Sequence, residues 1–548
     1  MGGPRERPED GAPGIDRRSV LRAGAFGAAG LASARFLAGC STMPSAAPVV
    51  PPVTIPPDAV YDCGVASGLH APDAAVLWTR VAPGAVAAVD VAWEVAIDPG
   101  FTSVVATGTA SAEPGADGCV KVLAQGLSPA TTHWYRFRVD GRTSPVGRTR
   151  TPAGEGAPVP RVRLGVASCQ NFPAGFYPAW RAMAAEDLDA VVHVGDYIYE
   201  SGGGSANPLN VRFDELGTAT TLAGYRAKYR LYRSDADLRA AHAAHAFLPV
   251  WDDHEFVNDY DRLTIVEQPA RAEAAYRAWF EYQPVWPIDG TRIHRRARFG
   301  SLVDLSLLDT RQYRDPHPNG GKGTLSATTD GPAREVHREG RTIMGDDQRT
   351  WLLDGFDDAQ DRGITWKLVG NQVMIAPVRI VDLDEPFLRL FNPDTPKHAG
   401  VYLNTDSWDG YQWERDEVMR HLHDGGVANV GFLTGDIHAF WQAPLLVDFD
   451  DDASPAVAQE FVCGSVSSRG LDYAGDLAAG LSEAAVGLRP GFRYVDLVRR
   501  GFGIIDCTSG SATVEFRVAD ASRPDGVVRP ASRFDWAAGT QDVRLVPA

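Results

Sequence analysis

Polar residues that could bind metal ions stand directly after short apolar runs at several places in the chain. Cys169 follows the apolar run 162–168. Asp196 follows the run 189–195, and Tyr199 stands three residues further on. The other residues of this kind are, in chain order, Asp252, Asp253, His254, Asn258, Asn371, Asp436 and His438. A thiolate, carboxylates, a phenol, amides and imidazoles together have the composition of a metal site, and their number favours more than one ion.

The residue types also indicate what such a site would hold. An aspartate at the end of a strand can bridge two cations through its two carboxylate oxygens, which is the position of Asp196. A phenolate from Tyr199 suits a hard trivalent ion better than zinc, so iron is favoured. Each residue has a plainer alternative: Cys169 as a buried thiol at a strand end, and Tyr199 as an aromatic plug.

The elements that must position these residues follow from the hydrophobic pattern. Short apolar runs alternate with longer stretches that have apolar residues at three- and four-residue spacing, which predicts strands and helices of an α/β region. The predicted strands are 162–168, 189–195, 247–251, 366–370 and 427–434, and the predicted helices are 222–244, 270–282, 346–360 and 413–423. Ligand groups in such sheets collect at the carboxyl ends of the strands. The polar residues are therefore expected to meet at one edge.

The remaining chain divides into segments of different composition. Residues 58–151 alternate apolar and polar residues between Gly, Pro and Asp turns, which predicts a small antiparallel β-sandwich of immunoglobulin or fibronectin type. A Pro-, Val- and Ala-rich linker at 48–57 precedes this segment. The α/β domain is expected over 160–525, and we interpret 526–548 as a C-terminal tail.

The first 47 residues are interpreted as a targeting segment. Arg17-Arg18 precedes an Ala- and Gly-rich stretch, which resembles a twin-arginine export signal. Leu37-Ala-Gly-Cys40 resembles a lipoprotein cleavage box with Cys40 as the lipidated residue, and the alternative is ordinary cleavage near Ala46-Ala47. We therefore expect the Tat export machinery as a partner. The expected location is extracellular, cell-surface or periplasmic, with a membrane anchor if Cys40 is lipidated.

Composition and charge restrict the function. The chain has 548 residues with 53 Lys and Arg against 70 Asp and Glu, a formal net charge of −17. This balance argues against specific nucleic-acid binding, because phosphate backbones attract clustered basic residues. Small phosphorylated substrates are compatible with this negative net charge, since bound cations can reverse the sign of the local electrostatic field in a cleft. Six cysteines in an exported protein suggest disulfides, and the natural local pairs are Cys63–Cys119 and Cys463–Cys507, although four cysteines allow three connectivities.

The order of the motifs resembles that of the alkaline phosphatase D (PhoD-like) family of the calcineurin-like metallophosphoesterase superfamily. The motifs that carry the resemblance are Gly165-Val-Ala-Ser-Cys-Gln-Asn171, His193-Val-Gly-Asp-Tyr-Ile-Tyr-Glu200, Trp251-Asp-Asp-His-Glu255, Leu308-Asp-Thr-Arg-Gln-Tyr-Arg314, Gly370-Asn-Gln-Val373 and Thr434-Gly-Asp-Ile-His-Ala-Phe-Trp441. The resemblance covers nearly everything after residue 58. It implies a four-layer αββα metallophosphoesterase sandwich preceded by the small β-sandwich.

The resemblance also implies a ligand set and a chemistry. By position, Cys169, Asp196, Tyr199 and His438 would hold iron (Fe³⁺). Calcium (Ca²⁺) would be held by Asp196, Asp253, Asn258, Asn371 and Asp436, and oxygen-only ligation suits calcium in any case. His254 would stabilise the developing charge or protonate the leaving oxygen. Arg311 and Arg314 would bind substrate phosphate, or equally pair with Asp309 or Asp315 in a structural network.

The expected function is therefore that of an exported, metal-dependent alkaline phosphatase or phosphodiesterase. It would hydrolyse small phosphate esters with a metal-activated water, and we expect a monomer. The alternative is a surface-anchored binding protein that binds a wall polymer through its β-sandwich. Its metal domain would then be a relict without catalytic activity. Every ligand-type position is filled, which favours the enzyme, and elemental analysis of the purified, exported protein is the most informative test.

Overall fold

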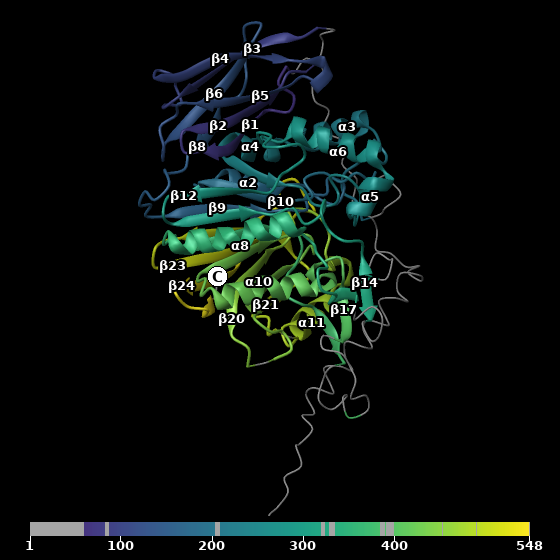
Figure 1. Cartoon of the computed structure of the whole chain (residues 1–548). Helices are drawn as coiled ribbons and strands as arrows, with labels where there is room; N and C mark the ends of the chain where they lie inside the picture. The colour runs from purple at the N-terminus through teal and green to yellow at the C-terminus, as the bar shows by residue number, and fades with distance from the viewer. Residues whose placement is uncertain are drawn as a thin grey trace, which may run out of the picture.

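The computed structural model describes residues 60–82, 87–202, 209–318, 324–327, 335–383, 390, 399–451, 453–488 and 490–546. The predicted export signal, Cys40 and the linker 48–57 lie outside the described residues. Within these ranges the chain forms a mixed α/β structure with four sheets (Figure 1). None of the described helices combines the length and apolarity needed to cross a bilayer.

The centre of the largest sheet is formed by three parallel strands with wholly or largely buried side chains. These strands are β9 (Val162–Ala167), β10 (Ala190–Val194) and β11 (Ala246–Val250), close to the predicted positions. On one side the sheet continues through β22 (Arg500–Cys507), β23 (Ser511–Ala519), β24 (Val528–Ala537) and β25 (Val543–Val546). On the other side it continues through β1 (Val65–Ala71), β2 (Ala74–Arg80) and β5 (Cys119–Gln125).

A second sheet contains four more parallel strands. They are β13 (Val303–Leu307), β15 (Trp366–Asn371), β18 (Val430–Thr434) and β20 (Ala456–Cys463). Antiparallel strands complete its edges: β12 (Arg295–Phe299), β19 (Phe440–Leu446) and β21 (Tyr494–Asp496). A small separate sheet consists of β14 (Thr324–Ala327), β16 (Arg379–Asp382) and β17 (Gly400–Asn404). In the chain, β14 lies between β13 and β15, and the other two strands lie between β15 and β18.

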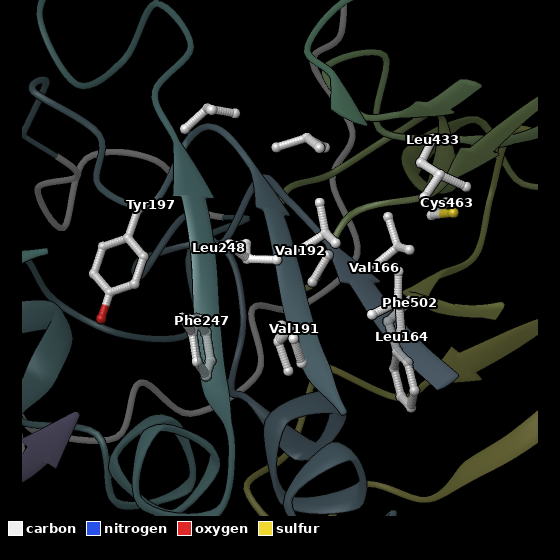
Figure 2. Close-up of a cluster of buried hydrophobic side chains, with 14 of the residues drawn as sticks. Leu164, Val166, Val191, Val192, Tyr197, Phe247, Leu248, Leu433, Cys463 and Phe502 are labelled. Carbon is white, nitrogen blue, oxygen red and sulfur yellow. The ribbon is translucent and has the colours of Figure 1, made fainter. Parts of the chain in front are cut away.

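The two large sheets pack face to face around one apolar core. Figure 2 shows Val166 and Val192 from the largest sheet near Leu433 and Cys463 from the second, and all four are buried in the same cluster. The sheets approach closely at Gly370, where an added Cβ would lie 3.3 Å from a Val192 methyl carbon. Burial of branched side chains on both faces stabilises such an interface by roughly 1.5–3 kcal/mol per residue.

Helices cover the outer faces of the two sheets. The helices α2 (Pro178–Ala184), α3 (Leu222–Arg233), α4 (Ala236–Ala244) and α6 (Pro269–Tyr282) contribute to the same core as the largest sheet. The helices α8 (Asp346–Asp361) and α10 (Gln412–Asp424) pack on the second sheet in another core. The short helices α5 (Arg262–Glu267) and α11 (Asp476–Ala485) lie near the periphery (Figure 1). The four layers are therefore helix, sheet, sheet and helix, which confirms the predicted αββα sandwich.

The stretch predicted as one helix over 222–244 is two helices in the structure. The first ends at Arg233, and Asp235 accepts hydrogen bonds from the backbone N–H groups of Asp237 and Leu238 at the start of the second. An aspartate in this position satisfies N–H groups that have no partner inside the helix. The break therefore follows from a local helix-capping signal at residue 235.

The N-terminal β region is a sandwich that shares a sheet with the α/β region. Its other layer consists of β3 (Val89–Ala96), β4 (Val104–Ala112), β6 (Thr132–Val139), β7 (Arg142–Thr143) and β8 (Gly147–Arg150), at one end of the molecule (Figure 1). A separate apolar core packs this layer against β1, β2 and β5. Because β1 pairs in parallel with β11, the sandwich and the α/β region form one continuous sheet.

Two expectations are corrected by the structure. The predicted tail 526–548 is structured over its described part, 526–546, because β24 and β25 extend the largest sheet and bury Phe534 and Trp536 against it. The expected disulfides are also absent: the five cysteines of the described chain are buried free thiols. Cys463 lies against Gly503, and Cys507 is four residues further along β22, roughly 13 Å away, which is too far for a disulfide.

Candidate metal centre

The predicted ligands converge from the carboxyl ends of strands in both sheets. Cys169, Asp196 and Asp253 follow β9, β10 and β11 of the largest sheet. Asp436 and His438 follow β18 of the second sheet. Since neighbouring parallel strands end at the same edge, the loops after them meet above the interface of the two sheets. The positions predicted from the strand pattern are thus brought together.

The backbone is strained at four of these residues. Cys169, Asp196, Asp436 and His438 have φ angles of 57°, 58°, 63° and 54°. Residues with a Cβ enter this left-handed region at a cost, and such residues concentrate at functional sites where the surroundings hold them in place. The left-handed backbone conformation directs these four side chains away from the strands and into the donor groups described below.

Two glycines make this close approach sterically possible. A Cβ at Gly195, which has a φ of +111°, would lie 2.3 Å from the Asp252 Cβ. A Cβ at Gly435 would lie 2.5 Å from the Ser168 Oγ. Gly195 therefore allows the ends of the neighbouring strands β10 and β11 to approach each other, and Gly435 allows strand ends from the two sheets to touch.

The first donor group matches the predicted iron ligands. Cys169, Asp196 and His438 each offer a ligand atom within 4.8 Å of the others. The Tyr199 hydroxyl lies 2.7 Å from Asp196 Oδ2 and 3.1 Å from His438 Nε2, so the phenol belongs to the same group. This mixture of one sulfur, one nitrogen and two oxygens fits a transition-metal ion such as iron.

The second donor region contains only carboxylate oxygens apart from His254. Asp252, Asp253 and Asp436 form one group within 4.8 Å, and Asp196, Asp253 and His254 form another. The Asp253 Oδ1 and Asp252 Oδ2 atoms are buried and have no hydrogen-bond partner among the described residues. Buried carboxylate oxygens are costly without a partner, so the arrangement fits a hard cation with oxygen ligands.

The electrostatics of the protein alone also favour bound cations. Burial raises the pKa of Asp196 well above its usual value, and the nearby Asp253 and Asp252 raise it further against the effect of His254. Burial and Asp252 raise the pKa of Asp436 in the same way, and burial and Asp196 raise that of the Cys169 thiol. A cation between these groups supplies the opposite charge and holds them ionised.

Arg311, which was predicted to contact substrate phosphate, lies next to the candidate ligand carboxylates. Its side chain is fully buried. The Nε atom donates to Asp252, and Nη1 donates to both oxygens of Asp406 at 2.9 and 2.8 Å. The Nη2 atom lies 3.8 Å from Asp253 Oδ2 and 3.6 Å from Asp436 Oδ1. Arg311 is thus a countercharge beneath the carboxylates. Its guanidinium pairs with neither Asp309 nor Asp315, although its backbone N–H donates to Asp309 Oδ1 at 3.1 Å. Arg314 is equally buried and also pairs with Asp406.

The two predicted asparagine ligands occupy different environments. Asn371 is fully buried, its amide nitrogen donates to the Val373 carbonyl at 2.6 Å, and its Oδ1 accepts from the Trp408 indole at 3.3 Å. These bonds engage both the nitrogen and the oxygen of the Asn371 amide. Asn258 is exposed at the rim, and its backbone N–H donates to Glu200.

The structure also adds residues that the sequence reasoning did not assign. Asp406 accepts hydrogen bonds from Arg311 and Arg314 and lies 2.5 Å from His317 Nε2. Ser468 Oγ lies 2.7 Å from the Tyr199 hydroxyl, and Glu200 contacts His254. Glu200 is the last residue of the motif 193–200 and directly follows the candidate ligand Tyr199. Its position in the motif could therefore have identified it from the sequence. Asp406 and Ser468 follow no comparable pattern.

Comparisons with known proteins agree with this geometry. The PhoD-like phosphatase family matches residues 164–516, and its N-terminal domain matches residues 51–153. Alkaline phosphatase D of Bacillus subtilis (strain 168) is 36% identical over 430 residues, which cover 75% of this chain and 70% of that protein. A solved structure of PhoD superposes with a TM-score of 0.79 at 32% identity, covering 92% of this chain and 94% of that chain.

A more distant structure shares the fold. A purple acid phosphatase from yellow lupin (Lupinus luteus) superposes with a TM-score of 0.51 at 11% identity, covering 86% of this chain and 73% of that chain. The two-sheet fold with donor groups at its strand ends is that of a metallophosphoesterase. Within that class, the chain belongs to the PhoD-like phosphatase family and is a phosphoric ester hydrolase.

Proposed function

We propose that this protein is a metal-dependent alkaline phosphatase or phosphodiesterase of the alkaline phosphatase D type. The observation that carries the proposal is the position of Asp196, which belongs both to the group with Cys169 and His438 and to the group with Asp253 and His254. A carboxylate shared by two donor groups is the arrangement that holds two ions next to each other. The direct test is turnover of nitrophenyl phosphate mono- and diesters by the purified protein.

The residues divide into two sets by their chemistry. Cys169, Tyr199 and His438 would hold iron, and Asp253 and Asp436 would hold calcium with Asn258 at the rim. When bound, the ions lower the pKa of water towards neutrality and offset charge on the phosphoryl group. Absence of turnover by protein that contains its metals would favour the alternative of a binding protein with a relict metal domain.

The protein's own residues supply the remaining chemistry. Arg311 and Asp406 fix the carboxylates from below, so that their oxygens stay directed at one small volume. His254 lies at the edge of that volume and is partly exposed, with 16% of its side chain accessible. This places an imidazole where it can give a proton to the departing oxygen of an ester.

Iron bound with a tyrosinate ligand is expected to give the protein a visible charge-transfer band. The reason is that the Tyr199 oxygen lies in the group with Asp196 and His438. We expect Tyr199→Phe to lose the band while it keeps the fold, because only the oxygen is removed. Absorption spectra and elemental analysis check this, and Tyr197→Phe, whose hydroxyl contacts His242 instead, is the matched control. Colourless, fully active protein with zinc alone would contradict the iron assignment.

Calcium removal is expected to abolish most of the activity. Asp252, Asp253 and Asp436 offer only oxygen atoms, which suit a large hard cation. Prolonged incubation with a calcium-selective chelator should stop turnover, and calcium should restore it where magnesium alone does not, since magnesium dehydrates reluctantly and demands a tighter octahedron. Full activity in excess chelator would rule the calcium assignment out.

We propose further that the protein is exported by the Tat machinery and acts as a monomer outside the cytoplasm. The support is the Arg17-Arg18 pair before an apolar stretch, with Cys40 as the site of a lipid anchor. Replacing both arginines with lysine is expected to retain the protein inside the cell, as fractionation and immunoblotting would measure. Cys40→Ser separates the anchor from export, because it should release exported protein from the membrane. Unchanged export of the lysine variant would contradict the signal.

A further inference from the structure

Glu200 forms a carboxylate–imidazole pair with His254. Its Oε2 lies 2.7 Å from His254 Nδ1, and 6% of the Glu200 side chain is exposed. The other carboxylate oxygen, Oε1, accepts a hydrogen bond of 3.2 Å from the backbone N–H of Asn258. Both oxygens are therefore used, and the carboxylate is itself held in place.

The imidazole is also held from a second direction. The ring of Tyr199 packs on that of His254, with 4.0 Å between the ring centroids and 31° between the planes. One ring contact and one hydrogen bond together restrict rotation about the side-chain bonds of His254. Nδ1 is the nitrogen in contact with Glu200, so Nε2 is the nitrogen left for the site.

We propose that Glu200 is a positioning residue that sets the tautomer and orientation of His254 for proton transfer to the leaving group. A carboxylate that accepts from Nδ1–H places the transferable proton of the imidazolium on Nε2. In the reaction, water oxygen forms the new bond to phosphorus and the bond to the leaving oxygen breaks. The electron pair of that bond goes to the leaving oxygen, which takes the Nε2 proton. One water proton stays on the phosphate product, and the other is released to solvent, from which the imidazole is protonated again. This proposal rests on the proposed phosphoesterase function and deepens it.

The chain offers a neighbouring carboxylate with a different task. Glu255 is buried and accepts hydrogen bonds from the backbone N–H groups of Asp196, Tyr197 and Asp252. Its hydrogen bonds stabilise the loops that carry the ligands, whereas Glu200 contacts the imidazole. The pair Glu200 and Glu255 therefore separates a positioning effect from a structural one.

The experiment compares Glu200→Ala, Glu200→Gln and Glu255→Gln on an alkyl and a nitrophenyl phosphate ester. An alkoxide needs a proton to leave and a nitrophenolate does not, so Glu200→Ala should lower turnover of the alkyl ester about 10–100-fold and that of the nitrophenyl ester much less. Glu200→Gln keeps an acceptor oxygen and should recover part of the loss. Glu255→Gln should affect both esters equally.

A double-mutant comparison completes the test. In a His254→Ala background, Glu200→Ala should change turnover by no more than about twofold, because its target is gone. Equal losses on both esters, full additivity with His254→Ala, or loss of iron and calcium from Glu200→Gln would each overturn the proposal. If the wild-type protein, with its metals measured, hydrolyses neither ester, the proposed function fails instead.

Discussion

Asp196→Ala is expected to lose bound metal from both donor groups and to reduce ester hydrolysis by on the order of 10⁴-fold or more, given the size of metal-assisted rate enhancements. The physical reason is that Asp196 is common to the group with Cys169 and the group with Asp253. Its removal takes one charged ligand from each ion. Elemental analysis and turnover of a nitrophenyl phosphate ester measure the two effects separately.

The matched control is a buried aspartate at the other end of a strand. Asp304 is the second residue of β13, is 3% exposed and pairs with Arg296 and Arg298. Asp304→Asn is expected to lower stability through the loss of these pairs while it keeps the metals and the activity. Asp196→Ala protein that retains both metals would show that the aspartate does not bridge them.

His254→Ala is expected to keep both metals and to lose most of its turnover. A general acid contributes about 10²–10⁴-fold, so the loss on an alkyl phosphate ester should fall in this range. The loss should shrink for a nitrophenyl ester, whose leaving oxygen needs no proton. Steady-state kinetics on both esters and elemental analysis of the same preparation measure this. His421→Ala, which removes a surface imidazole paired with Asp357, is the control.

The same variant distinguishes three roles for His254. An equal loss on both esters indicates electrostatic stabilisation of the transition state and not proton donation. Loss of metal indicates that the imidazole is a ligand, which its place in the group with Asp196 and Asp253 allows. A loss confined to the ester with the poor leaving group supports the proton donor.

Much of the fold was predictable because its signals are local. The predicted helices 270–282, 346–360 and 413–423 differ from α6, α8 and α10 by no more than one residue at each end. The parallel strands β9, β10 and β11 were predictable from apolar runs of about their own length. Buried parallel strands and amphipathic helices leave such patterns in the sequence itself.

The convergence of the candidate ligands could be predicted from local patterns, because a polar residue directly after a buried strand must lie at the sheet edge. Cys169, Asp196 and Asp436 were singled out in this way, together with Tyr199 and His438. Three other features became visible only in the folded chain: the burial of Arg311 on Asp406, the contact of Glu200 with His254, and the continuation of the largest sheet through β1 and β24. These contacts join residues 95 and 54 positions apart, or strands from opposite ends of the chain. No local pattern encodes them, since they depend on which charges and sheet edges meet once the chain has folded.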